Sequence, residues 1–342
     1  MTEVLSSEAF AVPSAWKRFV LPRRGDATSA PKPRAADVKA AGELLTAFDG
    51  DVRTALRHRL IAGDLAEAGH GYLAAGPDVT PLGAAVVARG IGGALPWLRR
   101  DELTAFADLW RARHGLAFAA AATVELAGFY LGSSPSAAAI TRSVPDSDAN
   151  GFGTRTAIRM AYQLRRAVVA APPEEYAAVV TALGGSRGPA LAQQALVSVI
   201  APDEAAWADD ICARVSALGG REALKGLLLT VVSAEPLASR LAGQLSAWAV
   251  LSESERIYTF TATLGPAAAP ALTGWLDAPV VDAQDRRKLL GLLAAVGGDA
   301  ALTALIERAG RPDVPGPEML GDMAADGIGD LLALPVRRHQ PV

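Results

Sequence analysis

The stretch Asp282–Gly310, with the sequence DAQDRRKLLGLLAAVGGDAALTALIERAG, predicts a pair of short helices over 283–296 and 299–309. Two glycines separate the helices, and glycine is the residue that most often ends a helix. An aspartate stands at the start of each helix, Asp282 at the first and Asp299 at the second, where a side-chain oxygen can cap the first turn. The stretch therefore predicts a helix–glycine–helix unit.

Each helix of this pair carries one apolar stripe. The first stripe consists of Leu289, Leu290, Leu292, Leu293 and Val296, and the second of Leu302, Leu305 and Ile306. Two short helices cannot bury such stripes by themselves and need similar neighbours on which to stack. We therefore expect the pair to belong to an α-solenoid.

Helical patterns of the same kind fill most of the chain. The expected helices are 36–48, 51–62, 64–75, 80–93, 101–113, 116–131, 154–170, 174–183, 188–200, 204–217, 221–233, 236–247, 253–263 and 267–277, followed by the pair above. The glycines that break the later pairs, Gly184, Gly219, Gly265 and Gly297, lie roughly 30 to 50 residues apart, as in HEAT-like repeats. The pattern predicts an all-α fold, a HEAT-like α-solenoid of stacked antiparallel helix pairs with an extended N-terminal arm.

Segments rich in proline, glycine and aspartate divide the chain into five expected parts. These are an extended Pro-rich arm and linker (1–36), an N-terminal helical layer (37–131), a loop (132–153), HEAT-like repeats (154–335) and a disordered tail (336–342).

Composition narrows the class of protein. Of the residues, 51% are hydrophobic but only 6% are aromatic, a balance that suits close helix packing. The net charge is −3, which disfavours non-specific binding to nucleic acid. The single cysteine, Cys212, excludes an intramolecular disulfide and a cysteine-only zinc site.

Neither a secretory signal nor a membrane span is visible. The longest apolar segment, 116–131, is interrupted by Thr123 and Glu125, and a transmembrane helix needs roughly 20 apolar residues. We therefore expect a cytoplasmic protein without membrane contact. Glu125 lies among alanine, leucine and phenylalanine, so it must be paired, protonated or turned toward an edge.

The N-terminal arm combines aromatic and basic residues. Trp16 lies beside Lys17 and Arg18, and Arg23 and Arg24 follow a few residues later. One interpretation is that the arm packs its apolar residues on the first helices and leaves the basic residues in solvent. The other is a recognition arm for an acidic partner, because tryptophan and arginine are common interface anchors. These five residues are the candidate partner-binding site.

A second candidate site lies in the expected loop. Asp146, Asp148, Asn150 and Gly151 match positions 1, 3, 5 and 6 of a calcium-binding EF-hand loop. Position 12, which should be glutamate, is Ala157. Such strings also arise in ordinary turns. We therefore expect a solvent loop and no metal site, with calcium binding as the alternative.

Motifs for catalysis are missing. The chain has no Walker-type phosphate loop, no complete dinucleotide fingerprint and no nucleophile elbow. We expect no catalytic residues and no cofactor, and predict a non-catalytic scaffold or adaptor that binds another protein. The alternatives are an all-α enzyme acting on small molecules and a nucleic-acid-binding helical-repeat protein. Aromatic and basic residues for the latter stand in two clusters, Trp97 with Arg99, Arg100 and Asp101, and Trp110 with Arg111 and Arg113.

Several strings together resemble a bacterial family. They are WKR at 16–18, LPRRG at 21–25, LW at 109–110, HGLAF at 114–118, EYAAVV at 175–180, APDEAAW at 201–207, WLDA at 275–278 and DRRKLL at 285–290. They are similar to the N-terminal helical-repeat region of MolR-like (molybdate-metabolism-regulator-like) proteins. The resemblance implies a helical-repeat fold over residues 10–335 and supplies no catalytic residues.

Overall fold

The computed structural model describes residues 10–26, 29–76, 79–132, 139–143, 152–233, 235–279 and 281–308. The chain divides into two units, which are described separately below. The N-terminal unit comprises residues 22–231, and the C-terminal unit comprises residues 1–21 together with 232–342. The end of the expected repeats, 309–335, and the expected disordered tail at 336–342 lie outside the described residues.

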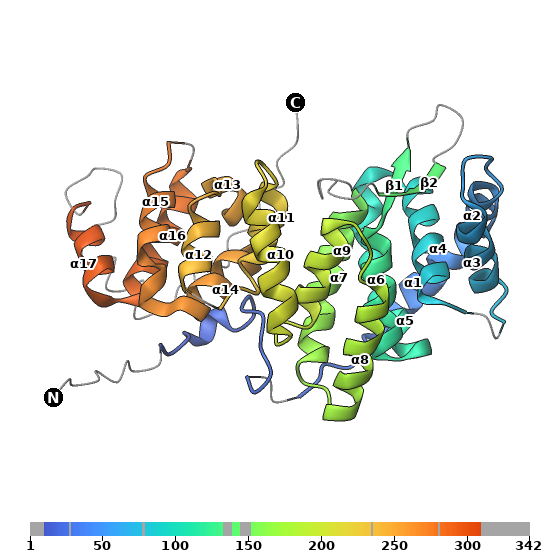
Figure 1. The fold of residues 1–342 in the computed structure, drawn as a ribbon, viewed down its shortest axis with the longest axis horizontal. Helices are drawn as coiled ribbons and strands as arrows, with labels where there is room; N and C mark the ends of the chain where they lie inside the picture. The colour runs from blue at the N-terminus through green and yellow to red at the C-terminus, as the bar shows by residue number, and fades with distance from the viewer. Residues whose placement is uncertain are drawn as a thin grey trace. The chain divides into compact units, whose positions relative to one another are not determined.

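The N-terminal unit consists of helices and one small hairpin (Figure 1). Its first elements are α1 (Ala35–Ala47), α2 (Asp49–Leu56), α3 (Gly63–Leu73), α4 (Pro81–Ala94), η2 (Trp97–Ala105), α5 (Phe106–His114) and α6 (Leu116–Ala127). Then come β1 (Phe129–Gly132), β2 (Ala139–Arg142), α7 (Phe152–Val168), α8 (Pro173–Ser186), α9 (Leu191–Ile200), α10 (Ala205–Ala217) and α11 (Glu222–Leu228).

Helix α6 is the centre of this unit. It packs against α4, α5, α7, α8 and α9, and most of its residues are buried. Alanine occupies much of α6, so neighbouring helices can approach closely on several sides. The first part of the apolar segment 116–131 is thus a buried helix, as its composition indicates.

The end of that segment differs from the prediction. The helix stops at Ala127, and Phe129–Gly132 pairs antiparallel with Ala139–Arg142, with Phe129 opposite Arg142. The expected loop at 132–153 therefore contains a strand. A short apolar run such as Phe129–Leu131 fits a helix or a strand equally well, because only the partner strand decides between them.

The C-terminal unit is made of shorter helices. Its described elements are η1 (Ser14–Trp16), α12 (Glu235–Ala242), α13 (Ala247–Leu251), α14 (Ser254–Leu264), η3 (Gly265–Ala268), α15 (Ala269–Leu276), α16 (Ala283–Val296) and α17 (Gly298–Ile306). Helices α15, α16 and α17 pack on one another, as Figure 1 shows. The all-α class predicted from the sequence is confirmed, with the hairpin as its one exception among the described residues.

The helix pair α16–α17 confirms one half of the prediction and corrects the other. All five residues of the first stripe are buried, and Asp282 caps α16 by accepting a hydrogen bond from the Asp285 amide at 2.8 Å. Helix α17 begins one residue earlier than expected, so Asp299 lies inside its first turn. Its buried residues are alanines, Ala301 and Ala304, whereas Leu302 and Ile306 of the predicted second stripe are exposed and Leu305 is half-buried.

Candidate functional site

The predicted partner-binding residue Trp16 belongs to the core of the C-terminal unit. Its side chain is 0% exposed, and its ring meets the edge of Tyr258 on α14 with 5.4 Å between centroids. Phe19 stacks on the same tyrosine at 5.0 Å, and the Leu21 amide donates a hydrogen bond to Thr259 Oγ1 at 2.9 Å. The arm packs its apolar residues on helices, but on α14 rather than on the first helices. Trp16 therefore stabilises the unit and is not an open anchor.

Two predicted residues, Lys17 and Arg18, remain exposed. The Arg18 guanidinium lies over the Phe19 ring, 4.6 Å from its centroid. A cation over an aromatic face stabilises the ring's position by about 0.5 to 1 kcal/mol at an exposed site. Their role in binding a partner stays a prediction.

Arg23 and Arg24 fasten the chain within the N-terminal unit. Arg23 donates hydrogen bonds to the carbonyl oxygens of Pro202, at 3.1 Å, and Val231. Arg24 donates to the Ala171 carbonyl at 3.3 Å and lies 4.2 Å from the Tyr176 ring centroid. Both guanidinium groups therefore make internal contacts, whereas the sequence predicted them in solvent or on a partner.

A third arginine in this region was missed from the sequence. Arg165 on α7 is fully buried and donates to the carbonyls of Pro22 and Thr230, both at 2.8 Å. Burial lowers the pKa of its guanidinium to about 9, and the nearby charge of Arg23 acts in the same direction. The sequence does contain a signal for this burial. Arg165 lies four residues after the buried Ala161 and three before the buried Val168, so helical spacing places it on the apolar face of α7.

The residues considered for nucleic-acid binding are mostly used inside the unit. Trp110 is fully buried, and its indole nitrogen donates to the Tyr72 hydroxyl at 3.2 Å. Arg111 donates to the Pro31 carbonyl at 2.7 Å, and Arg99 pairs with Glu102 at 2.8 Å. Trp110 is therefore closed to base stacking.

Metal-binding residues do not gather in the part of the chain that the structure describes. No group of three or more histidine, cysteine, aspartate or glutamate residues there could hold a metal ion. The calcium-like residues Asp146, Asp148 and Asn150 lie outside the described residues. Cys212 is buried on α10, and burial raises the pKa of its thiol to about 12, so it is a poor nucleophile. Over the same described ranges, the helices are too short or too polar to cross a membrane.

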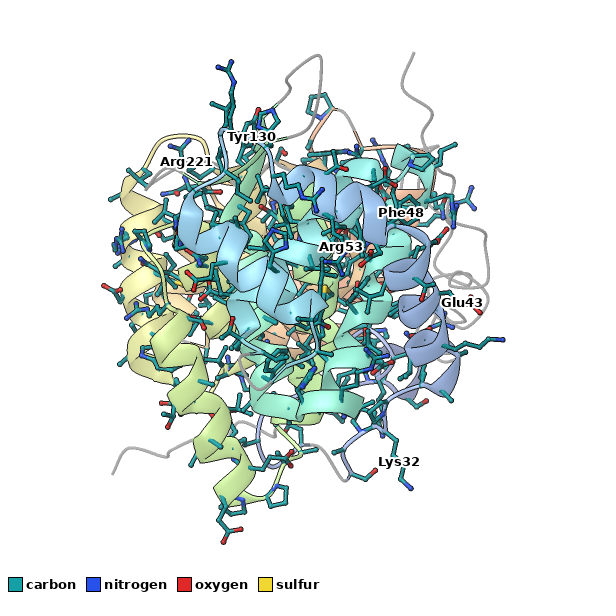
Figure 2. All side chains as sticks on the ribbon, turned by 90° about the vertical axis from the view of Figure 1, so that its right-hand side faces the viewer. Lys32, Glu43, Phe48, Arg53, Tyr130 and Arg221 are labelled. Carbon is teal, nitrogen blue, oxygen red and sulfur yellow. The ribbon has the colours of Figure 1, made fainter. Side chains whose placement is uncertain are left out.

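A polar cavity of about 150 Å³ lies where α6, the hairpin, α8 and α9 meet. Its wall includes Glu125 from α6, Phe129 and Arg142 from the two strands, Ser186 from the end of α8, and Gln193 from α9. Side chains of successive strand residues point to opposite faces, so Phe129 is buried while Tyr130 is 54% exposed. Figure 2 shows Tyr130 at the upper edge of this unit, at the hairpin.

Glu125 is the acid of this cavity. Burial raises the pKa of its carboxyl above the usual value, while a hydrogen bond from Ser186 and the charge of Arg142 act in the opposite direction. Arg142 itself pairs with Asp64 on α3. Of the three possibilities for Glu125, the structure therefore shows a carboxyl turned toward a polar edge of the core. Ser186 and Arg142 compensate its charge only in part.

Two glycines shape the wall around Gln193. A Cβ atom built on Gly128 would lie 2.6 Å from the Gln193 Nε2 atom, and one on Gly188 would overlap its Oε1 atom. Both positions must stay without a side chain for the amide of Gln193 to lie between them. No local sequence pattern predicts this site, because its residues come from five elements and only Glu125 stands out from its neighbours in the sequence.

Comparison with known proteins assigns a family but no activity. The model of the YehI second domain matches residues 38–248, which is more than half of the chain and runs from α1 into α13. No curated protein matches the chain, and no solved structure does. The matched family is a helical domain family, in agreement with the helices described above. The chain belongs to the family of the YehI second domain.

Proposed function

We propose that this protein is a non-catalytic scaffold or adaptor that binds another protein through its helical surface. The observation that carries the proposal is a set of exposed apolar side chains in the C-terminal unit. Trp248 on α13 is 67% exposed, and Leu302 and Ile306 on α17 are 57% and 65% exposed. Complete burial of one such side chain by a partner would contribute about 1.5 to 3 kcal/mol to the free energy of binding.

The placement of these residues supports the proposal. Leu302 and Ile306 are four residues apart, so they lie on one face of α17 and can enter the same partner surface. Tryptophan is among the residues that most often dominate the energy of protein interfaces. Trp248 is therefore the best candidate for a central contact.

The finer architecture is part of the same proposal. Helices α15, α16 and α17 follow one another in the chain and pack on one another, as helix pairs of HEAT-like repeats do. Helical-repeat stacks offer extended binding surfaces without catalytic groups. The proposal includes the resemblance to MolR-like proteins. It also includes a cytoplasmic location, where the single buried cysteine would stay reduced.

The test is a capture experiment with the full chain, since deleting the arm would remove Trp16 from the core. Proteins captured from a lysate of the native host are identified, purified and titrated against wild type, Trp248→Ala and Leu98→Ala. Leu98 is the matched control, because it is 66% exposed but lies on η2 of the other unit.

We expect Trp248→Ala to weaken the binding of the identified partner at least 10-fold, and Leu98→Ala to leave it within 2-fold. Equal affinities for both variants would remove Trp248 from the interface. Failure to purify any protein that binds directly would overturn the proposed function.

A further inference from the structure

We infer that the cavity around Glu125 is a socket for a cationic side chain of a partner protein, a lysine ammonium or an arginine guanidinium. The inference rests on the proposed function, because it supposes a protein partner. It concerns the N-terminal unit and is independent of the apolar residues on α13 and α17.

The first argument is space. A cavity of about 150 Å³ is as large as an engineered cavity that admits benzene. An alkylammonium or a guanidinium group is of comparable size. The cavity is polar, since a carboxyl, a carboxamide, a guanidinium and a serine hydroxyl all line it.

The second argument is charge. Arg142 pairs with Asp64 and also acts on Glu125, so one guanidinium serves two carboxylates. An ionised Glu125 therefore leaves an excess of negative charge at the cavity. A cation beside Glu125 would supply the counter-charge that the wall lacks, whereas an anion would have to displace Asp64 from Arg142.

The third argument is hydrogen bonding. Gln193 is only 6% exposed, and none of the described residues is hydrogen-bonded to its carboxamide. The carboxamide borders the cavity, so a group that enters the cavity can become its hydrogen-bond partner. Gly128 and Gly188 hold this amide at the wall, where its oxygen can accept an N–H from an ammonium or a guanidinium.

The cost of this arrangement points to binding rather than stability. Burial disfavours the charged form of Glu125, and a leucine or glutamine at this position would remove that penalty. A half-buried acid whose charge is only partly compensated therefore has a cost in the empty protein. A bound cation would relieve it.

The experiment measures small probes on the full chain by ligand-observed NMR. The probes are the N-acetyl N-methylamides of lysine and arginine, with the norleucine derivative as a neutral comparison of similar shape. The variants are Glu125→Gln, which removes the charge and keeps the size, and Glu174→Gln as control. Glu174 is also a glutamate of this unit, but it is exposed at the start of α8.

We expect at least one cationic probe to bind 10-fold or more tightly than the norleucine derivative, and Glu125→Gln to weaken it at least 10-fold. Glu174→Gln should bind like wild type. Equal binding of all three probes, unchanged binding by Glu125→Gln, or no detectable binding would each overturn the socket.

The capture experiment separates this inference from the proposed function. A partner that loses affinity with Trp248→Ala but not with Glu125→Gln would support the scaffold and reject the socket. Cationic probes that bind at Glu125 when no protein partner can be purified would support a cation site and reject the scaffold.

Discussion

Glycines shape two contacts of the N-terminal unit in different ways. Between α3 and α4 they let the two helices pack without a gap. Between α6, α8 and α9 they hold a polar side chain beside an open space. In the first contact, Gly83 of α4 lies against the Ala68 carbonyl of α3, and Gly69 of α3 lies against Val86 of α4 and also against Leu56 at the end of α2. In the second, Gly128 and Gly188 lie against the Gln193 amide, and about 150 Å³ remains unfilled.

The difference lies in what surrounds each glycine. Backbone cannot move without shifting a helix, and a buried leucine has no free volume to enter. The Gln193 amide, in contrast, can rotate into the cavity. A graded series of alanine substitutions should therefore distinguish a contact built for packing from one that leaves room for a ligand.

The largest effect is expected for Gly83→Ala. A Cβ atom there would overlap the Ala68 carbonyl oxygen, so α3 and α4 must move apart. We expect a loss of about 3 kcal/mol in the free energy of unfolding. Hydrogen–deuterium exchange of peptides from α3 and α4 would localise the loss. The control is Gly50→Ala on α2, where no atom lies within 4 Å and alanine should be neutral or slightly stabilising.

A smaller loss, about 1 to 2 kcal/mol, is expected for Gly69→Ala. Its Cβ would lie 2.6 Å from a methyl carbon of Leu56 and 3.2 Å from Val86 Cγ1. Leu56 is 2% exposed, so it must change rotamer inside a filled core. Urea denaturation would measure the loss. A loss of unfolding free energy as large as that of Gly83→Ala would mean that Leu56 cannot change its rotamer and resists the new Cβ atom as strongly as the backbone does.

Gly188→Ala should cost less than about 1 kcal/mol, because the Gln193 amide can move into the cavity. The same movement fills the socket, so binding of the cationic probes should fall at least 5-fold. Gly185→Ala is the matched control, since it also lines the cavity but has no atom within 4 Å. A large loss of stability with unchanged probe binding would show that Gln193 is fixed and does not border a usable space.

Sequence alone predicted the local part of this fold well. The stripe on α16 and its Asp282 cap depend on residues a few positions apart, and both are present. The second stripe failed at Leu302 and Ile306, because alanine can bury a helix face as well as leucine when neighbours are close. Periodicity identifies a helix, but the choice of buried face depends on its neighbours.

Contacts between distant residues could not be predicted in the same way. Trp16 packs on Tyr258, more than two hundred positions along the chain, and no local pattern encodes that pairing. The cavity residues Glu125, Arg142 and Gln193 come together only because α6 stops at Ala127 and a hairpin forms. The sequence marked Glu125 as a polar residue in an apolar helix, and the rest of the site required the fold.

The smallest effect on stability belongs to Glu125→Gln, and its pH dependence is the sharpest test of the open contact. Burial raises the folded-state pKa of Glu125 above its ordinary value of 4.5, so between these two values the folded protein holds more protons than the unfolded chain. The free energy of unfolding of the wild type therefore falls as the pH rises through this window. Glutamine removes this loss and can still accept the hydrogen bond from Ser186.

Glu125→Gln should thus be slightly more stable than wild type at pH 8, by less than about 1 kcal/mol, and the difference should vanish as the pH falls below 4.5. Paired urea titrations of wild type and Glu125→Gln over this range would measure the difference. A variant less stable than wild type at pH 8 would mean that Arg142 and Ser186 fully compensate the carboxylate. Glu125 would then be a packing residue like Leu56, and the contrast between the closed and the open contact would disappear.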